Sequence, residues 1–158
     1  MPKPRRSHGI ANRQRRARPR KAVVGLLVDR VLDCENEPRG LSVVFVGERT
    51  IQRLNRQWMA EDRPTDVLSF PLGDPPPGSD PAAVALGEVV ICIAVCARQA
   101  RERRVPLHDE VARMLIHGTL HVLGFDHARS KEAASMRARE RRHLAWYRRR
   151  RLRVVEAP

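Results

Sequence analysis

The chain has 158 residues, 42% of them hydrophobic and only 4% aromatic, which suits one domain with an aliphatic core and excludes global disorder. Its longest apolar run, at 22–28, is far shorter than the roughly 18 to 20 residues of a membrane span, and the charged residues that follow it disfavour a secretory signal. A formal charge of +13 is compatible with binding a polyanion such as nucleic acid or a membrane surface, and equally with an arginine-rich composition that has no such role.

Hydrophobic periodicity predicts a mixture of helices and strands. A 3.6-residue period indicates a helix, and short β-branched apolar runs indicate strands. The helices are expected at 22–34, 48–60, 95–104, 107–123 and 130–148, and the strands at 41–47, 66–72 and 85–94. Pro71 indicates that its strand ends there or lies at the edge of a sheet. The predicted fold class is α+β, loosely α/β: a small mixed β-sheet of about four strands packed with about five helices.

The basic residues are concentrated at the two ends of the chain. Residues 1–21 hold nine of them and no acid, and residues 137–158 hold nine arginines and two glutamates, which leaves a mildly acidic centre. We therefore expect a basic N-terminal arm over 1–20, a single domain over 21–150 and a C-terminal tail over 151–158. Composition predicts a mobile arm, although residues 8–15 are also compatible with a short edge strand.

The segment HGTLHVLGFDH at 117–127 carries the most specific chemical signal. His117 and His121 are four residues apart, so they lie on one face of a helix. Gly124 is placed where a left-handed cap would reverse the chain and return His127 toward the same point. Three imidazoles predict a zinc site at the end of a helix, similar to that of the zincins. Three protein ligands would leave a fourth position open, as in catalytic zinc sites.

The histidine spacing matches that of the metzincin proteases, with one difference. Those enzymes carry a glutamate as general base after the first histidine, and this chain has Gly118 there. The absence of that carboxylate favours a substrate for which a metal-activated nucleophile and charge stabilisation suffice, such as a phosphodiester.

Four blocks of the chain resemble the YbeY family of bacterial rRNA maturation factors, which are single-strand-specific, metal-dependent endoribonucleases. The blocks are LNRQW and DRPTDVLSFP within 54–71, LGEVVIC at 86–92, HGTLHVLGFDH at 117–127, and Met136 with Glu140. The resemblance covers about residues 40–145. It implies one zinc ion on His117, His121 and His127, cleavage of RNA in the domain at 21–150, and a role in maturing the 3′ end of small-subunit (16S) rRNA and in ribosome quality control.

One position departs from the family pattern. The family has an arginine directly after the aromatic residue of the first block, and here Met59 follows Trp58. A guanidinium near the metal would stabilise charge on the phosphoryl oxygens. Arg56 and Arg63 are nearby substitutes, or else solvated surface residues. The residues proposed for catalysis are therefore only Arg63 and Asp126.

Several other residues have two interpretations. Asp126 would accept a hydrogen bond from a ligand histidine or act as a turn residue. Glu110 would orient a ligand in the same way or face solvent in the first turn of its helix. Cys92 and Cys96 are expected to be buried apolar side chains outside the metal set. The segment 64–71 is expected to line the substrate groove. Near the C-terminus, Trp146 and Tyr147 lie among arginines. These side chains would stack on RNA bases and bind phosphates, or they are simply the solvated end of a helix.

The sequence thus predicts a cytoplasmic zinc endoribonuclease, since three cysteines without framework spacing favour a reducing compartment. The partners implied by the resemblance are single-stranded RNA, small-subunit rRNA and the small ribosomal subunit, with a ribosome-assembly GTPase and ribosomal proteins as further candidates and no membrane. The alternatives are a non-catalytic, zinc-containing ribosome-assembly factor that binds RNA, and a zinc metalloprotease.

Overall fold

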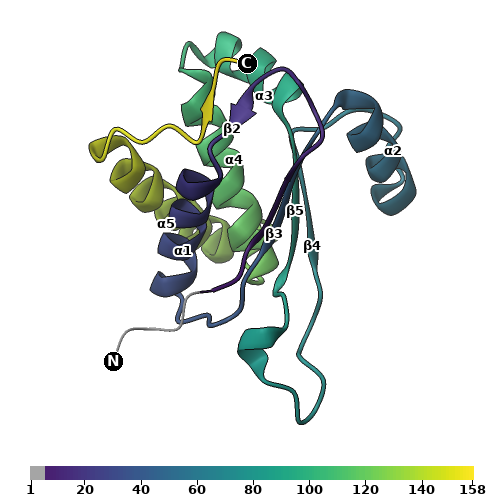
Figure 1. The fold of residues 1–158 in the computed structure, drawn as a ribbon, viewed down its shortest axis with the longest axis vertical. Helices are drawn as coiled ribbons and strands as arrows, with labels where there is room; N and C mark the ends of the chain where they lie inside the picture. The colour runs from purple at the N-terminus through teal and green to yellow at the C-terminus, as the bar shows by residue number, and fades with distance from the viewer. Residues whose placement is uncertain (1–5) are drawn as a thin grey trace.

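The computed structural model describes residues 6–158, which form one mixed sheet, a small second sheet and five α-helices (Figure 1). The strands are β1 (Gly9–Asn12), β2 (Arg18–Pro19), β3 (Ser42–Val46), β4 (Val67–Pro71), β5 (Gly87–Cys92) and β6 (Val155–Glu156). The helices are α1 (Lys21–Cys34), α2 (Glu48–Met59), α3 (Ile93–Arg103), α4 (Leu107–Val122) and α5 (Ser130–Arg149), with a short 3-10 turn at Pro81–Ala83. Every helix and strand predicted from 22 to 148 is present within a few residues of its expected bounds, and the α+β class is confirmed.

The main sheet has the strand order β1-β3-β5-β4. β1, β3 and β5 run parallel, and β4 runs antiparallel to β5 with Leu68 opposite Val90. β4 is therefore an edge strand that ends at Pro71, as the proline predicted. Its outer edge carries no strand partner among residues 6–158.

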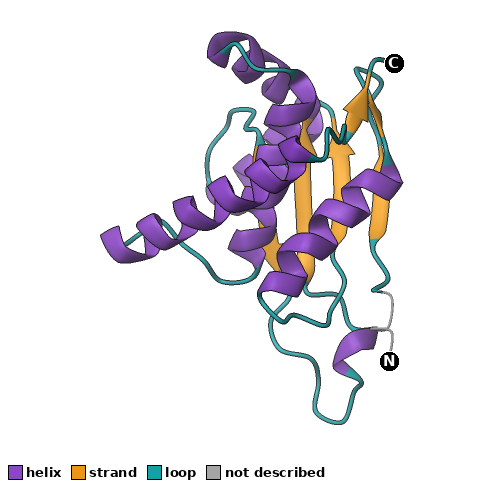
Figure 2. Ribbon diagram, turned by 90° about the vertical axis from the view of Figure 1, so that its left-hand side faces the viewer, coloured by secondary structure: helices purple, strands orange, loops and turns teal. Residues whose placement is uncertain are grey.

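Helices cover the two faces of the sheet unequally. α1, α4 and α5 lie together on one face, and α2 lies on the other (Figures 1 and 2). The larger core forms under the three helices from residues such as Leu27, Phe45 and Leu115, and a smaller cluster with Ile51 and Leu68 lies under α2. α4 is the central helix, because it contacts β4, β5 and the helices on either side of it. This packing fixes the end of α4 beside the edge strand β4.

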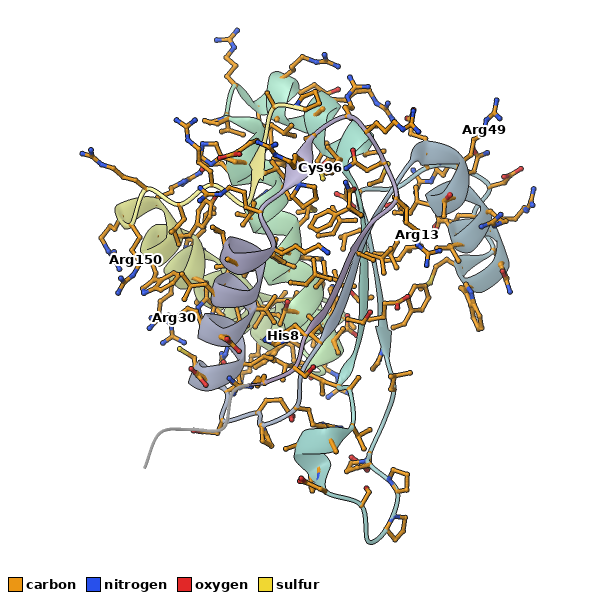
Figure 3. The ribbon with its side chains drawn as sticks, viewed as in Figure 1. His8, Arg13, Arg30, Arg49, Cys96 and Arg150 are labelled. Atoms are coloured by element: carbon orange, nitrogen blue, oxygen red, sulfur yellow. The ribbon has the colours of Figure 1, made fainter. Side chains whose placement is uncertain are left out.

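The N-terminal segment is part of the fold from residue 6 onward. β1 pairs with β3, and β2 pairs with β6 near the C-terminus. The side chain of His8 accepts a hydrogen bond from the backbone N–H of Leu41 and lies 2.9 Å from Asp29 (Figure 3), while Arg6 pairs with Asp29 and Asp33. Residues 9–12 therefore form the short edge strand that the sequence left open as the alternative to a mobile arm. Residues 1–5 lie outside the described part of the chain.

The C-terminal residues also join the core rather than trailing from it. Val154 and Val155 are buried, and the Val154 N–H donates to the hydroxyl of Tyr147. Among residues 6–158, no helix combines the length and the apolar character that crossing a membrane requires.

Candidate metal centre

The end of α4 brings the three predicted histidines to one point. His117 and His121 project from successive turns of the helix, which ends at Val122. Gly124 then adopts φ +100°, and the N–H groups of Gly124 and Phe125 donate to the carbonyls of His121 and Leu120. This pair of bonds is the Schellman motif, which reverses the chain after a helix. The reversal carries His127 back to the face that bears the other two histidines.

The three rings form a group that could bind a metal ion. One ligand nitrogen from each of His117, His121 and His127 lies within 4.8 Å of the other two, and the ring centroids are 4.5 to 5.1 Å apart. Tetrahedral zinc with bonds of 2.0 to 2.1 Å needs ligand nitrogens about 3.4 Å apart, so small side-chain rotations would complete the set. Two of the rings are half-buried and His127 is exposed, which leaves the site accessible from solvent.

A glutamate from another helix fixes the orientation of the first histidine. Nδ1 of His117 lies 2.5 Å from Oε1 of Glu140 on α5. Burial raises the pKa of Glu140, but the hydrogen bond with His117 and the nearby positive charges outweigh it, so the pKa is lowered overall and the carboxylate is ionised at neutral pH. Nδ1 must then donate its proton, which leaves Nε2 as the metal-binding atom.

His121 is prepared for a metal in a different way. Burial lowers the pKa of His121, and the neighbouring imidazoles of His117 and His127 lower it further. The ring is therefore neutral at pH 7, which is the form that binds a metal. A set of three imidazole nitrogens suits zinc better than calcium or magnesium, which prefer oxygen ligands. The donor chemistry of the site fits the predicted zinc ion.

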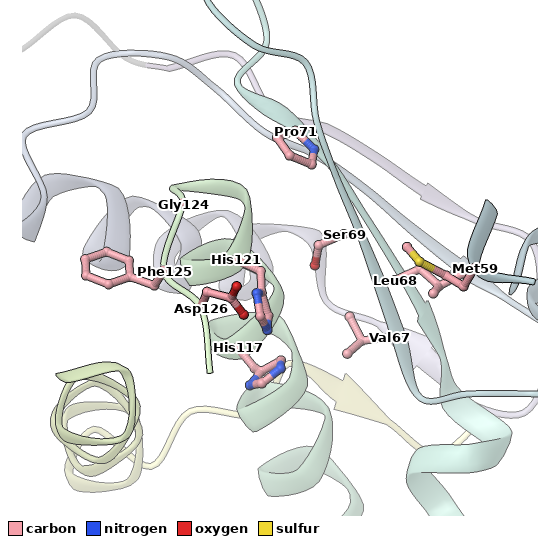
Figure 4. Close-up of a pocket in the computed structure, with 10 residues that line it drawn as sticks. All are labelled: Met59, Val67, Leu68, Ser69, Pro71, His117, His121, Gly124, Phe125 and Asp126. Atoms are coloured by element: carbon pink, nitrogen blue, oxygen red, sulfur yellow. The ribbon is translucent and has the colours of Figure 1, made fainter. Parts of the chain in front are cut away.

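His117 and His121 line a cavity of about 420 Å³ between α4 and β4. Figure 4 shows His117 and His121 facing β4, with Phe125 at one end of the cavity and Met59 at the other. The wall opposite the histidines is made by the strand in the segment 64–71, which was expected to line the groove. Its lining residues are Val67, Leu68, Ser69 and Pro71.

Gly118 faces the sheet at very close range. A Cβ atom at this position would lie 2.7 Å from Cγ1 of Val89 and 3.1 Å from Cγ2 of Val67. The hydroxyl of Ser69 also donates to the Gly118 carbonyl. The position that holds the general base in metzincins therefore has no room for any side chain in this fold, which is a physical reason for the glycine.

The two residues proposed for catalysis lie differently. Asp126 lines the cavity and its carboxylate accepts the backbone N–H of His127, as a turn residue would. The side chain of Arg63 is 74% exposed, pairs with Glu61 and is not among the residues that line the cavity. The structure therefore brings Asp126, and not Arg63, to the histidines.

The family arginine has no substitute among the residues that line the cavity. Met59 occupies its place and lines the cavity, and Arg56 points to solvent with Asp62 as a distant partner at 3.9 Å. The cavity therefore has an apolar thioether where the family pattern has a guanidinium.

Both interpretations of Glu110 were wrong. The residue is 1% exposed, and its carboxylate pairs with Arg113 at 2.5 Å and with Arg103 at 3.6 Å. Glu110 forms ion pairs with Arg113 on its own helix and with Arg103 at the end of α3, and not with the histidines. Cys92 and Cys96 are buried, as expected, and burial raises the pKa of both thiols.

Glu140 belongs to the fourth sequence block, but its role is visible only in the structure. Its signal was weak, because Glu140 lies 23 residues after His117 on an arginine-rich helix. Met136 is fully buried one turn before Glu140, so the spacing of four residues places Glu140 on the face of α5 that packs against α4.

The fold and the site define an α+β protein in which two histidines at the end of one helix line a cavity beside the edge strand of a mixed sheet, and a third histidine returns to them from the following loop. Residues 10–148 match the family model described as Endoribonuclease YbeY, and the chain therefore belongs to the YbeY family.

The comparisons with individual proteins agree with this assignment. A Myxococcus xanthus protein named Endoribonuclease YbeY is 49% identical over 104 residues, which are 66% of this chain and 35% of that protein. One of the same name from Chromohalobacter salexigens is 45% identical over 127 residues, or 80% of this chain and 79% of that one. The chain spans about a third to three fifths of the length of the first curated relatives it matches.

A solved structure has the same fold. The solution structure of TM1509 from Thermotoga maritima superposes with a TM-score of 0.63 and 25% sequence identity, over 91% of this chain and 92% of that one. The match therefore includes the sheet and the helices that surround the cavity.

Proposed function

We propose that this protein is a zinc-dependent endoribonuclease that cleaves single-stranded RNA in the cytoplasm and matures the 3′ end of small-subunit rRNA, with a role in ribosome quality control. The observation that carries the proposal is the group of three histidines beside an open cavity, with His117 oriented by Glu140, in a chain from the YbeY family. Relatives that cover most of the chain are named endoribonucleases.

The side chains around the cavity have distinct tasks in this proposal. His117, His121 and His127 would hold zinc, which when bound acts as a Lewis acid toward a phosphate oxygen and increases the acidity of bound water. Glu140 holds the proton on Nδ1 of His117, so that Nε2 faces the cavity. The carboxylate of Asp126 lies at the cavity wall, where it would accept a proton from the attacking group.

Two nucleophiles are compatible with this site. Attack by water would leave ordinary hydrolysis products, whereas attack by the 2′-hydroxyl of the RNA would leave a cyclic phosphate. Analysis of the new RNA ends by mass spectrometry distinguishes the two outcomes.

Met59 supports the second candidate, a non-catalytic assembly factor that binds RNA and contains zinc. The family arginine would contribute a positive charge to the transition state, and the chain has no arginine among the residues that line the cavity. A metalloprotease is disfavoured because the position of its general base, Gly118, is packed against the sheet.

The test compares the wild type with His121→Ala and Met59→Arg, each stripped of metal and reloaded with zinc. The substrates are an end-labelled single-stranded RNA and a duplex that contains the same strand. We expect the wild type to cleave only the single strand and to lose cleavage with a chelator or with His121→Ala. Met59→Arg should cleave faster.

The other outcomes would favour one of the two alternative functions. If Met59→Arg cleaves RNA and the wild type does not, the natural protein is the non-catalytic factor, and its metal site lacks only the arginine. If neither protein cleaves RNA and zinc-loaded wild type degrades casein, the metalloprotease is correct. Asp126→Asn should slow cleavage without loss of zinc if its carboxylate accepts the proton.

We also propose the small ribosomal subunit as the partner, together with a ribosome-assembly GTPase and ribosomal proteins. The support is the family of the chain and its positive charge of +13. Co-sedimentation with purified small subunits, with and without their precursor rRNA tail, tests this proposal.

A further inference from the structure

Exposed apolar side chains occur at the end of α2 and just after β4, the strand that forms one wall of the cavity. Among residues 6–158, the large hydrophobic side chains that are well exposed are Leu26, Trp58, Met59 and Leu72. Met59 lines the cavity, Trp58 precedes it in the last turn of α2, and Leu72 directly follows β4. Single exposed apolar residues are common, but a group beside a candidate active site indicates contact with a ligand.

The ring of Trp58 is held in place and still accessible. It makes a T-shaped contact with Phe70 on β4, with ring centroids 6.0 Å apart, and it is 61% exposed. The neighbours of Phe70 in the strand, Ser69 and Pro71, line the cavity on the other side of β4. Trp58 thus lies just across the edge strand from the histidines.

The backbone under Trp58 is fixed as well. Ile51 anchors α2 in the core under that helix. The buried side-chain amide of Asn55 donates to the backbone carbonyl of Arg63, and the backbone carbonyl of Asn55 accepts the N–H of Glu61. These bonds close the loop that follows α2. A ligand would therefore meet an aromatic ring whose position is already set.

Exposed arginines lie on the same helix as this ring and in the loop that follows it. The exposed arginines of α2 and the following loop are Arg49, Arg53, Arg56 and Arg63, and Arg49 extends from the helix into solvent (Figure 3). Arg56 and Arg63 pair with Asp62 and Glu61, which are themselves exposed and belong to the same loop. An exposed aromatic ring among arginines favours a nucleobase with its phosphate over an apolar peptide.

We propose that Trp58 is a stacking platform for one base of the single-stranded RNA, next to the nucleotide whose phosphate lies at the histidines. The inference rests on the proposed function and adds a base subsite to it. The site would prefer unpaired nucleotides, because a base in a duplex does not expose its face for stacking on Trp58.

The first test is a binding cycle in the presence of a chelator, which prevents cleavage. An end-labelled short oligoadenylate is measured by fluorescence anisotropy against wild type, Trp58→Ala and Trp58→Phe. We expect Trp58→Ala to weaken binding about 5- to 150-fold and Trp58→Phe to restore most of it, since stacking on an aromatic ring carries that range per base. Leu26→Ala, an exposed apolar residue on α1, is the matched control and should bind as wild type does.

The second step replaces single nucleotides of the oligomer with abasic ones. One position should weaken binding to the wild type and have no effect on Trp58→Ala, because the partner of that base is already absent. Equal losses in both proteins at every position would overturn the stacking assignment and would indicate a general surface effect of the substitution.

Trp58 also provides a direct signal. In Trp146→Phe it is the only tryptophan, and its emission should be quenched by the single strand and unchanged by a duplex. Unchanged emission with both would refute the proposal.

Normal zinc content in Trp58→Ala shows that the variant is folded. If wild type cleaves RNA and Trp58→Ala binds equally well, the subsite is wrong and the proposed function stands. If wild type neither binds nor cleaves RNA, both fail.

Discussion

Nδ1 of His117 lies 2.5 Å from Oε1 of Glu140, so α5 determines which nitrogen of a residue on α4 faces the cavity. The contact joins two helices that also pack through apolar residues such as Met136, which is fully buried. A change in the position of α5 would therefore rotate a histidine of the candidate metal centre, and the long helix is part of the site as well as of the core.

Glu140→Ala should weaken zinc binding about 10- to 100-fold, the range found when a carboxylate behind a ligand histidine is removed. Glu140→Gln keeps an acceptor for the Nδ1 proton but loses the charge, so a smaller loss is expected. Competition with a chromophoric chelator measures the affinity. Glu132→Gln, an exposed position on the same helix, is the control, and equal affinity in all three variants would contradict the role of Glu140.

Gly118→Ala should lower the free energy of unfolding by about 1 to 3 kcal/mol, because the added Cβ would lie 2.7 Å from Val89 and the sheet would have to move. Gly118→Glu, which restores the metzincin sequence, should be more damaging still and should not create protease activity. Gly47→Ala is the control, since nothing lies within 4 Å of a Cβ there and its φ of −85° is ordinary. Urea denaturation of the metal-free proteins measures the difference. A Gly118→Ala protein as stable as Gly47→Ala would show that the space between Gly118 and Val89 accepts a methyl group.

Sequence patterns predicted the histidine group well because its geometry is local. The spacing of four residues and the glycine after the helix are both set within the segment 117–127. The edge position of β4 followed from Pro71 in the same way, since a residue without an N–H cannot occupy a central strand. Local constraints of this kind need no knowledge of the rest of the fold.

The parts that sequence missed depend on contacts between distant segments. Composition left β1 as either part of a mobile arm or a short edge strand, and its pairing with the distant strand β3 decides between them. Glu110 has the composition of a solvent-facing position at the start of a helix, but two arginines from its surroundings make its burial acceptable. Charge patterns alone do not reveal which charged residues are paired inside the protein.

His143 should make stability depend on pH between about 6.5 and 4. The ring is fully buried and neither ring nitrogen has a hydrogen-bond partner. Burial, followed by the charges of Arg142 and Arg30, lowers the pKa of His143 to about 4. The unfolded chain has a pKa near 6.5 and binds the proton first as the pH falls, so this residue reduces stability toward pH 4 by a total on the order of 3 kcal/mol.

The measurement is urea denaturation at several pH values with a chelator present, so that metal release does not contribute. His143→Leu should remove this part of the pH dependence and leave stability at pH 7.5 similar or higher, because an unpaired buried polar group is lost. Parallel curves for the two proteins from pH 7.5 to 4 would mean that His143 is hydrated or paired in solution.

Removing residues 1–16 should unfold or strongly destabilise the protein, because the deletion takes away β1 together with the contacts of Arg6 and His8 to α1.

A test of the N-terminal arm in RNA binding must therefore keep the backbone of β1 in place. The exposed side chains of Arg13, Arg15 and Arg16 follow β1, and the Arg13 N–H continues the pairing with the carbonyl of Phe45. Replacing the three with glutamine should preserve the fold and weaken single-stranded RNA binding. The slope of log Kd against log salt should fall by about 2, since each phosphate contact on a single strand contributes about 0.7. Zinc content should not change, because these arginines are not part of the histidine group at the C-terminal end of α4. An unchanged salt slope would show that these arginines make no contact with RNA and that the positive charge acts elsewhere on the molecule.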